Sequence, residues 1–269
     1  MKKILTRAAL LFGLVVVVSV AGSAYASHSW GNYHWARTAN PFTLKTVDSV
    51  TSTWDAYLDT AISDWSASSV LNLTKEAGLI GSSDRKRCKP IAGKIRACNQ
   101  TYGKNGWLGL AQIWASGSHI TQATTKVNDT YFNTATYNTP AWKRLVMCQE
   151  IAHDFGLAHQ NEGFGAPNLG SCMDYTNDPD GGGAYGPSNE HPNQHDYDQL
   201  VTIYTHLDSS TTIGQLVGKA FGLARADEVQ NDEEWGEAVG HDASGRANEF
   251  VKYTGNGNRV VTHVFWVLE

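Results

Sequence analysis

The residues between 149 and 159 have the types and the spacing needed to hold a metal ion. Gln149, Glu150 and His153 are followed by Gly156 and His159. On a helix, positions 149 and 153 project from one face, one turn apart. We expect Gly156 to end that helix, because glycine adopts the left-handed conformation that turns the chain sharply. The turn would return His159 to the same face, so three donors and a carboxylate would converge on one point.

This convergence suits a catalytic zinc ion. Such an ion takes three protein ligands and leaves a fourth position to a water, whose pKa it lowers to about 7. We predict Gln149, His153 and His159 as the ligands. Glu150 is placed to accept the proton of that water as it attacks a carbonyl, and to pass it to the leaving amine. The predicted reaction is hydrolysis of a peptide bond.

The pattern resembles the zinc-binding consensus H-E-x-x-H-x-x-G-x-x-H of the metzincin metallopeptidases, and most closely that of the matrixin-like branch. Every position matches except the first, where Gln149 stands in place of a histidine. Residues 171–175, Ser-Cys-Met-Asp-Tyr, resemble the Met-turn of the same clan. The resemblance covers residues 30–208, approximately. It implies that Met173 forms an apolar floor under the metal and that Tyr175 lies close to the site.

The resemblance also implies a fold and a way of binding substrate. The fold would be α/β (α+β): a twisted mixed sheet with an active-site helix and a C-terminal helix. Residues 106–114 would form an edge strand along which an extended polypeptide substrate pairs through main-chain hydrogen bonds. Gly109, Leu110 and Ala111 would contact that substrate. The alternative is an ordinary edge strand with no such role.

Gln149 leaves three interpretations open. In the first, its amide oxygen is a genuine third ligand, although it is neutral and a weaker donor to zinc than imidazole. In the second, His153 and His159 share the ion with a ligand from elsewhere, for which His119 and His191 are candidates. In the third, the site is degenerate and the protein is a catalytically inactive, secreted binding module. The carboxylate at the next position favours the first interpretation.

Hydrophobic periodicity predicts the elements around this site. Apolar residues three or four positions apart indicate helices, and alternating or short apolar runs indicate strands. The predicted helices span residues 51–65, 139–156 and 195–206. The predicted strands span residues 42–45, 70–74, 107–114 and 120–127. A strand, a helix and then several strands indicate an α/β arrangement with helices packed on a mixed sheet.

All four cysteines follow the first 26 residues, and in an exported chain they favour two disulfides. Three pairings are possible. We favour Cys88 with Cys98 and Cys148 with Cys172, because each bridge then closes a compact unit. The second bridge would tie the motif helix to the loop that contains Met173. The alternative makes one cysteine a metal ligand or nucleophile, but the chain contains no Cys-x-x-Cys motif.

The first 26 residues have the pattern of a secretory signal peptide. Basic residues at positions 2, 3 and 7 precede an apolar run from 8 to 20, and Ala24-Tyr25-Ala26 forms a small-x-small cleavage site before Ser27. An uncleaved membrane anchor is the alternative. The apolar run is shorter than the roughly 20 residues that a spanning helix needs. We therefore expect a secreted, extracellular protein with no membrane attachment after cleavage.

The charge balance bears on the partners. Removal of the signal peptide lowers the 21 basic residues to 18 against 26 acidic ones, a formal net charge of −8. Such a balance argues against nucleic acid or an anionic membrane as a partner. We expect a polypeptide substrate and a monomeric protein.

The chain is predicted to contain a metallopeptidase domain at residues 27–208, a linker at 209–234 and a small β-hairpin appendage at 235–269. Gly255-Asn256-Gly257-Asn258 would form the hairpin turn. The acids of residues 195–198 are expected to favour the amino end of the last helix rather than to bind metal. Asp178 and Asp180, ahead of three glycines, could bind Ca²⁺ through oxygen atoms but lack the spacing of a calcium loop. That loop is more simply interpreted as a wall of the substrate pocket.

Overall fold

A computed structural model describes residues 28–214 and 232–268. The predicted signal peptide and most of the predicted linker lie outside the described residues. Its strands are β1 (His34–Trp35), β2 (Phe42–Ser49), β3 (Leu71–Ala77), β4 (Ile95–Gln100), β5 (Trp107–Ser116), β6 (His119–Asn128), β7 (Glu237–His241), β8 (Ala247–Gly255) and β9 (Asn258–Trp266). Its helices are α1 (Asp55–Trp65), α2 (Ser82–Arg87), α3 (Asp129–Phe132), α4 (Pro140–His153), α5 (Gln194–Ile203) and α6 (Asp232–Trp235).

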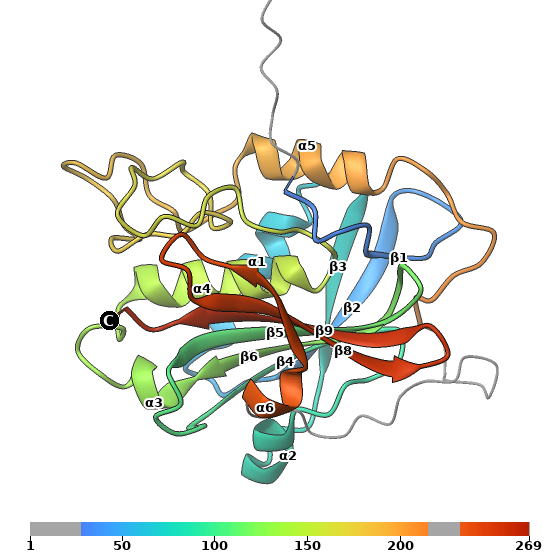
Figure 1. Ribbon diagram of the computed structural model, residues 1–269, viewed down its shortest axis with the longest axis horizontal. Coiled ribbons are helices and arrows are strands. Elements are labelled where there is room, and N and C mark those ends of the chain that lie inside the picture. Colours follow the sequence, from blue (N-terminus) through green and yellow to red (C-terminus); the bar gives the residue numbers. More distant parts are fainter. Residues whose placement is uncertain (1–27, 215–231, 269) are drawn as a thin grey trace, which may run out of the picture.

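The strands form one twisted sheet with the helices packed around it (Figure 1). Their order is β3-β2-β4-β6-β5-β9-β8-β7, and β1 pairs separately with β6. The strands β2, β3, β4 and β6 are parallel to one another, whereas β5 is antiparallel to both β6 and β9. The predicted mixed α/β fold is therefore confirmed. Among the described helices, none has the length and apolar character to cross a membrane.

Strand β4 lies in the middle of the sheet, in a region whose polar sequence did not predict a strand. Its polar side chains are buried but have partners inside the fold. Arg96 is 6 % exposed, and its Nε donates to Ser49 Oγ at 3.0 Å. Asn99 donates to Thr51 Oγ1 at 3.0 Å. Because these hydrogen bonds offset the cost of burial, a central strand can contain residues that are usually exposed.

Helix α4 carries the motif and is buried along most of its length. Thr139 caps its amino end by accepting a hydrogen bond from the Trp142 N–H at 3.2 Å, and Pro140 occupies the first turn. Helix α1 packs against it, and Trp65 donates its indole N–H to the Cys148 carbonyl at 3.0 Å. These contacts fix the helix that presents the motif.

Two disulfides hold the loops around these elements. Cys88 is bonded to Cys98, and Cys148 is bonded to Cys172. Both predicted pairings are therefore confirmed. The second bond links α4 directly to the loop that contains Met173. At the start of α5, Asp196 and Asn193 form a reciprocal capping box, which agrees with the capping role expected for the acids of residues 195–198.

The C-terminal hairpin continues the main sheet. Strands β8 and β9 turn at Asn256-Gly257, as expected, and β9 then pairs with β5 from Trp107 opposite Trp266 to Ser116 opposite Asn258. The prediction that β5 is an edge strand is therefore wrong. An open β5 would leave a row of N–H and C=O groups without partners, and β9 satisfies that row. It also buries Val261, Val264 and Phe265 completely.

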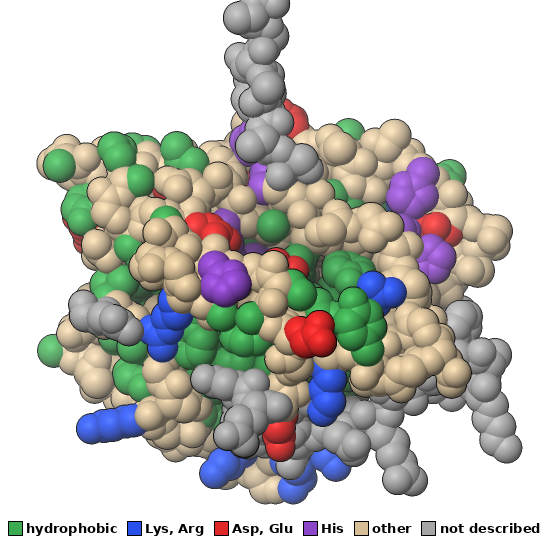
Figure 2. Space-filling model, viewed as in Figure 1, with side chains coloured by type: hydrophobic (Ala, Val, Ile, Leu, Met, Phe, Trp, Pro, Cys, Tyr) green, Lys and Arg blue, Asp and Glu red, His purple; other side chains and the backbone are tan. Residues whose placement is uncertain are grey.

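Histidines gather on one part of the molecular surface. Figure 2 shows the face on which β8 and β9 lie, with apolar side chains near its middle. Lys and Arg side chains follow the lower edge of this view, and histidines lie mainly in the upper half. The upper half is the side on which α5 and the loop after α4 lie.

Candidate metal centre

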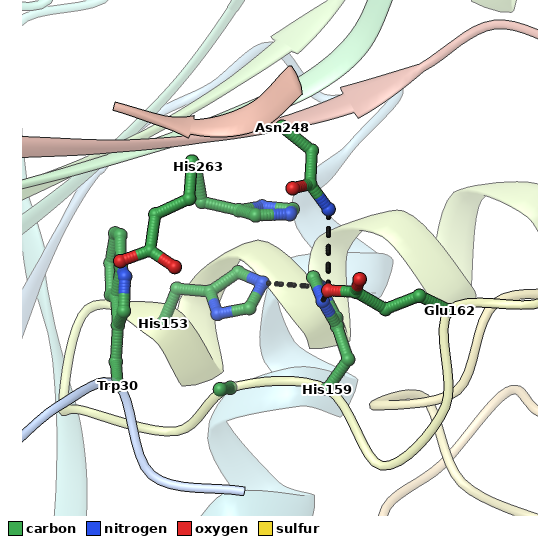
Figure 3. Close-up of a pocket in the computed structure, with 8 residues that line it drawn as sticks. Trp30, His153, His159, Glu162, Asn248 and His263 are labelled. Carbon is green, nitrogen blue, oxygen red and sulfur yellow. Dashed lines mark hydrogen bonds and ion pairs between the residues drawn. The ribbon is translucent and has the colours of Figure 1, made fainter. Parts of the chain in front are cut away.

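The turn after α4 brings His153 and His159 together. Gly156 adopts a φ of +98°, and a Cβ at this position would lie 2.3 Å from the Tyr33 carbonyl oxygen. Only glycine combines this backbone conformation with this close approach. The chain reverses here, and the Nε2 atoms of the two histidines lie 3.1 Å apart. The two ring planes lie at 87° to each other, and Figure 3 shows both rings below the C-terminal hairpin.

A third imidazole comes from β9, near the end of the chain. The ring centroid of His263 lies 4.0 Å from that of His153 and 4.4 Å from that of His159. One ligand nitrogen from each of the three histidines lies within 4.8 Å of the others. His263 is 3 % exposed and belongs to the strand that pairs with β5. Three segments of the chain thus meet at one point.

Hydrogen bonds fix the orientation of two of these rings. His153 Nδ1 lies 2.7 Å from the Leu157 carbonyl oxygen, and His159 Nδ1 lies 2.6 Å from Glu162 Oε1. Carbonyl and carboxylate oxygens only accept hydrogen bonds, so both Nδ1 atoms carry the hydrogen. In the neutral rings, the Nε2 lone pairs therefore face each other. A metal cation between or beside them, or a proton shared by the two rings, makes this arrangement favourable.

A zinc ion fits this spacing. Zinc–nitrogen bonds of 2.0–2.1 Å at tetrahedral angles place two ligand nitrogens about 3.3 Å apart, close to the observed 3.1 Å between His153 and His159. Burial, and then the nearby His159, lower the pKa of His153 well below its ordinary value. A proton is therefore held poorly at this position. A divalent cation suits the three imidazoles better.

Glu150 lies beside this cluster in the interior. Its side chain is fully buried, and its Oε2 is 3.6 Å from His263 Nδ1. Neither carboxylate oxygen has a hydrogen-bond partner among the described residues. Burial, and then the Asp154 carboxyl, raise the pKa of Glu150 well above its ordinary value. Gly109 of β5 makes room for this group, because a Cβ there would lie 2.5 Å from Glu150 Oε1.

Gln149 is turned toward the disulfide-bonded loop. Its Nε2 donates to the Cys172 carbonyl oxygen at 2.7 Å, and its Oε1 has no hydrogen-bond partner in the described part of the chain. It does not line the cavity between the histidines. Its role as a ligand stays a prediction. The other two candidates lie elsewhere, because His119 contacts Asp208 and His191 contacts Asp64.

The predicted Met-turn lies next to the cluster. Tyr175 is fully buried, its ring centroid is 4.4 Å from that of His159, and its hydroxyl lies 3.0 Å from His263 Nε2. Burial raises the pKa of this hydroxyl well above its ordinary value, so it stays a neutral hydrogen-bonding group. Met173 is also fully buried, and its carbonyl accepts the Gln160 N–H at 2.6 Å. The floor role of Met173 stays a prediction.

The hairpin closes the cavity at the cluster. Asn248 of β8 donates to Glu162 Oε1 at 3.2 Å and to the Tyr175 hydroxyl at 3.3 Å. The cavity volume is about 30 Å³, and its walls include Trp30, His153, His159, Glu162, Asn248 and His263. One water needs about 10–15 Å³. The cavity therefore has room for an ion or a few small atoms, but not for a peptide.

The strand predicted to bind substrate is already paired. Gly109, Leu110 and Ala111 lie opposite Phe265, Val264 and His263 of β9. Their other side faces β6. In this arrangement these three residues have a strand on both sides and offer no open edge to a substrate. The calcium site at Asp178 and Asp180 stays a prediction.

Sequence reasoning missed two residues of the centre. Glu162 orients His159 and lies three positions after it, so an acid in the short loop after the motif could have drawn attention. His263 had no comparable signal, because it is a single histidine in an apolar strand 104 positions after His159. Only the pairing of β9 with β5 places it at the motif.

Comparison with known proteins adds one structural likeness. No family model and no curated protein matches the chain. Among solved structures, the chain is similar to high choriolytic enzyme 1, a hatching-enzyme zinc protease from the medaka fish Oryzias latipes. The sequence identity is 11 %, the match covers 64 % of this chain and 94 % of that one, and the TM-score is 0.35. The proposals below rest on the side chains of this chain alone.

Proposed function

We propose that this chain is a secreted, zinc-dependent endopeptidase whose metal is held by His153, His159 and His263. The observation that carries the proposal is the pair of Nε2 atoms facing each other at 3.1 Å, with a third imidazole and a carboxylate beside them. In this proposal the interpretation that takes a ligand from outside the motif is correct, and His263 is that ligand. In this proposal Gln149 lies near the metal site and is not its third ligand.

The chain's own groups divide the work of hydrolysis. A zinc ion at this site would act as a Lewis acid and make a nearby water more acidic. Glu150 is the proton acceptor, since its carboxylate is unpartnered and lies beside His263. A carboxylate in this place could take a proton and later give it to the leaving amine. Glu162 keeps His159 in the tautomer whose Nε2 faces the centre.

The hairpin must leave β5 before a polypeptide can pair with that strand. Each side of a strand takes one neighbour, and β5 has β6 on one side and β9 on the other. We therefore propose that the described arrangement is a closed, latent form. In this form the hairpin covers β5 and supplies His263, so a hairpin that leaves β5 would also withdraw His263 and leave the zinc on His153 and His159.

The first test compares zinc content and proteolysis. The mature protein, residues 27–269, would be stripped with a chelator, reloaded with Zn²⁺ and assayed for casein hydrolysis. We expect Glu150→Ala to retain zinc and to lose hydrolysis by at least about 100-fold, the scale of general base catalysis. Glu237→Ala, at an exposed glutamate of β7, is the matched control and should retain full activity. Equal hydrolysis by wild type and Glu150→Ala would overturn the mechanism.

A second test locks the hairpin in place. Gln112 of β5 and Thr262 of β9 are paired, and Gln112 Nε2 donates to Thr262 Oγ1 at 3.1 Å. A Gln112→Cys/Thr262→Cys double variant, with the extra disulfide verified by mass spectrometry, should bind zinc but fail to cut casein. Each single variant serves as a control and should remain active. Undiminished cutting by the locked protein would show that the hairpin need not move.

A catalytically silent, metal-binding module is the second candidate. The observation that favours it is the full pairing of β5 by β9, which leaves no open substrate edge. In that case zinc would bind, as in the first test, but wild type, Glu150→Ala and the locked variant would all be equally inactive on casein. Zinc binding with Glu150-dependent hydrolysis would exclude it.

A further inference from the structure

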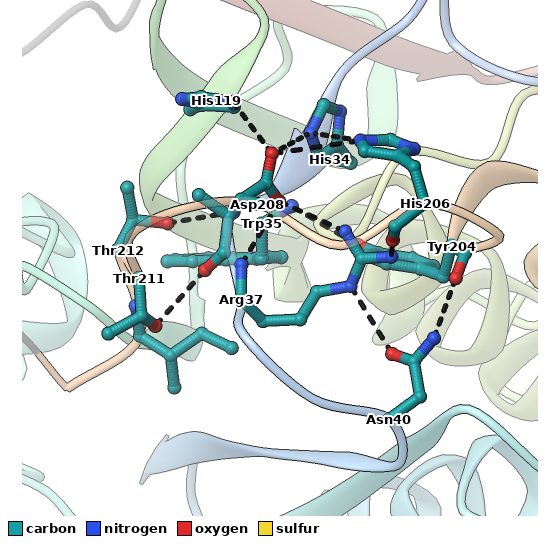
Figure 4. A network of polar contacts seen from close by, with 12 residues as sticks. His34, Trp35, Arg37, Asn40, His119, Tyr204, His206, Asp208, Thr211 and Thr212 are labelled. Atoms are coloured by element: carbon teal, nitrogen blue, oxygen red, sulfur yellow. Dashed lines mark hydrogen bonds and ion pairs between the residues drawn. The ribbon is translucent and has the colours of Figure 1, made fainter.

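A second group of histidines surrounds the carboxylate of Asp208, apart from the centre at His153. His34 lies in β1, His119 begins β6, and His206 and Asp208 follow α5. The three Nε2 atoms lie 3.5, 3.2 and 3.7 Å, respectively, from the same oxygen, Asp208 Oδ1. His34 Nε2 and His206 Nε2 are 3.1 Å apart. Figure 4 shows the rings of these histidines converging on this carboxylate.

The tautomer of His34 directs a lone pair toward this point. Its Nδ1 lies 2.8 Å from the Asn32 carbonyl oxygen, which can only accept a hydrogen bond, so Nδ1 carries the hydrogen. The neutral ring then presents the Nε2 lone pair toward His206 and Asp208.

Asp208 is held so that one of its oxygens stays available. Its Oδ2 accepts the Arg37 backbone N–H and a guanidinium N–H, each at 3.1 Å. Arg37 is 2 % exposed. Its guanidinium lies over the Tyr204 ring, 4.7 Å from the centroid, and donates to the His206 carbonyl. The hydrogen bonds to Oδ2 orient the carboxylate and leave its Oδ1 to the histidines.

We propose that His34, His119, His206 and Asp208 form a second zinc site. Four nitrogen and oxygen ligands at 2.0–2.2 Å from a tetrahedral zinc ion lie about 3.3–3.5 Å from one another. The ligand atoms of His34, His119 and Asp208 lie within 4.8 Å of one another, and His206 Nε2 lies 3.1 Å from His34 Nε2 and 3.7 Å from Asp208 Oδ1. Three imidazoles and one carboxylate also suit zinc chemically. The site does not share any residue with the centre at His153.

Four protein ligands make this a structural site. A closed, four-ligand set is typical of zinc ions that stabilise a fold. Here the ion would join three segments far apart in the sequence: β1, the start of β6 and the segment after α5. His119 and His206 have side chains that are 39 % and 52 % exposed, and they border a cavity of about 430 Å³. That opening gives the ion a path from solvent.

The test uses the two exposed ligands, because their replacement should leave the fold intact. The reloaded wild-type protein should contain two zinc ions per chain by elemental analysis, one for each group of ligands. His119→Ala and His206→Ala should each reduce this to one. The control His191→Ala, at an exposed histidine outside both groups, should retain two. The loss of affinity should exceed the about 10–100-fold that follows removal of an outer partner.

A thermal measurement separates this site from the first one. Zinc should raise the Tm of wild type through both sites. His119→Ala should lose the part of the rise that comes from the second site and should retain the zinc that depends on His153. A His153→Ala variant should show the reverse loss. Unchanged stoichiometry and an unchanged Tm response in both His119→Ala and His206→Ala would overturn the proposal. A single zinc per wild-type chain, removed only by His153→Ala, would also overturn it and would identify these histidines as a proton-sharing cluster around Asp208.

Discussion

Replacement of His263 by alanine separates the two candidate third ligands at the centre. His263 is 3 % exposed and contributes one of three imidazoles whose donor atoms lie within 4.8 Å of one another. Gln149 Oε1 accepts no hydrogen bond from the described residues, and its Nε2 donates to the Cys172 carbonyl. The His263→Ala and Gln149→Ala variants should therefore differ strongly in zinc affinity.

The size of the effect follows from the number of ligands. Structural zinc sites with four ligands contribute about 10–16 kcal/mol, or about 2.5–4 kcal/mol for each ligand. At 1.4 kcal/mol for each tenfold change, His263→Ala should weaken zinc binding by about 60- to 700-fold. Gln149→Ala removes no imidazole and should change the affinity by less than about tenfold. The fold should survive His263→Ala, since the Tyr175 hydroxyl retains Asn248 as a partner at 3.3 Å.

The assay is competition for Zn²⁺ against a chromophoric chelator, with circular dichroism to verify the fold of each variant. Both variants would also contain His119→Ala, so that the second proposed site does not contribute to the signal. Unchanged affinity in the His263→Ala variant, together with a large loss in Gln149→Ala, would refute the assignment. It would show that the third ligand beside His153 and His159 is Gln149.

Three further predictions concern the scaffold of the centre. Gly156→Ala should lower the free energy of unfolding by at least about 2 kcal/mol in urea denaturation, because its φ of +98° and the Tyr33 carbonyl at 2.3 Å both exclude a Cβ; an unchanged midpoint would contradict this. Gly109→Ala should displace Glu150 and reduce casein hydrolysis while zinc content stays constant; full activity would contradict it. Replacing Cys148 and Cys172 by alanines should lower the free energy of unfolding by about 3.5 kcal/mol, because the bond closes the longer loop. Replacing Cys88 and Cys98 should lower it by about 2.7 kcal/mol. Urea denaturation of the two variants measures both values, and the reverse order would contradict the prediction.

Local patterns predicted the elements that carry the motif. The apolar spacing of residues 54–65 and the Thr139-Pro140 start predicted α1 and α4 because capping and helical periodicity depend on neighbours in the sequence. The alternation of residues 120–127 predicted β6 for the same reason. Strand β4 was not predicted, because its Arg96 and Asn99 are buried only by virtue of partners on other elements.

The sequence by itself determined the spacing of His153, Gly156 and His159, and hence the meeting of two imidazoles, because a helix and a glycine turn fix that geometry within seven residues. The pairing of the four cysteines followed from similar local reasoning. Only the tertiary structure decided the third imidazole and the state of β5. His263 reaches the motif through the long-range pairing of β9 with β5, and no local pattern encodes which strand edge a distant hairpin covers. The same holds for the cluster at Asp208, whose ligands come from three segments that meet only in the folded chain.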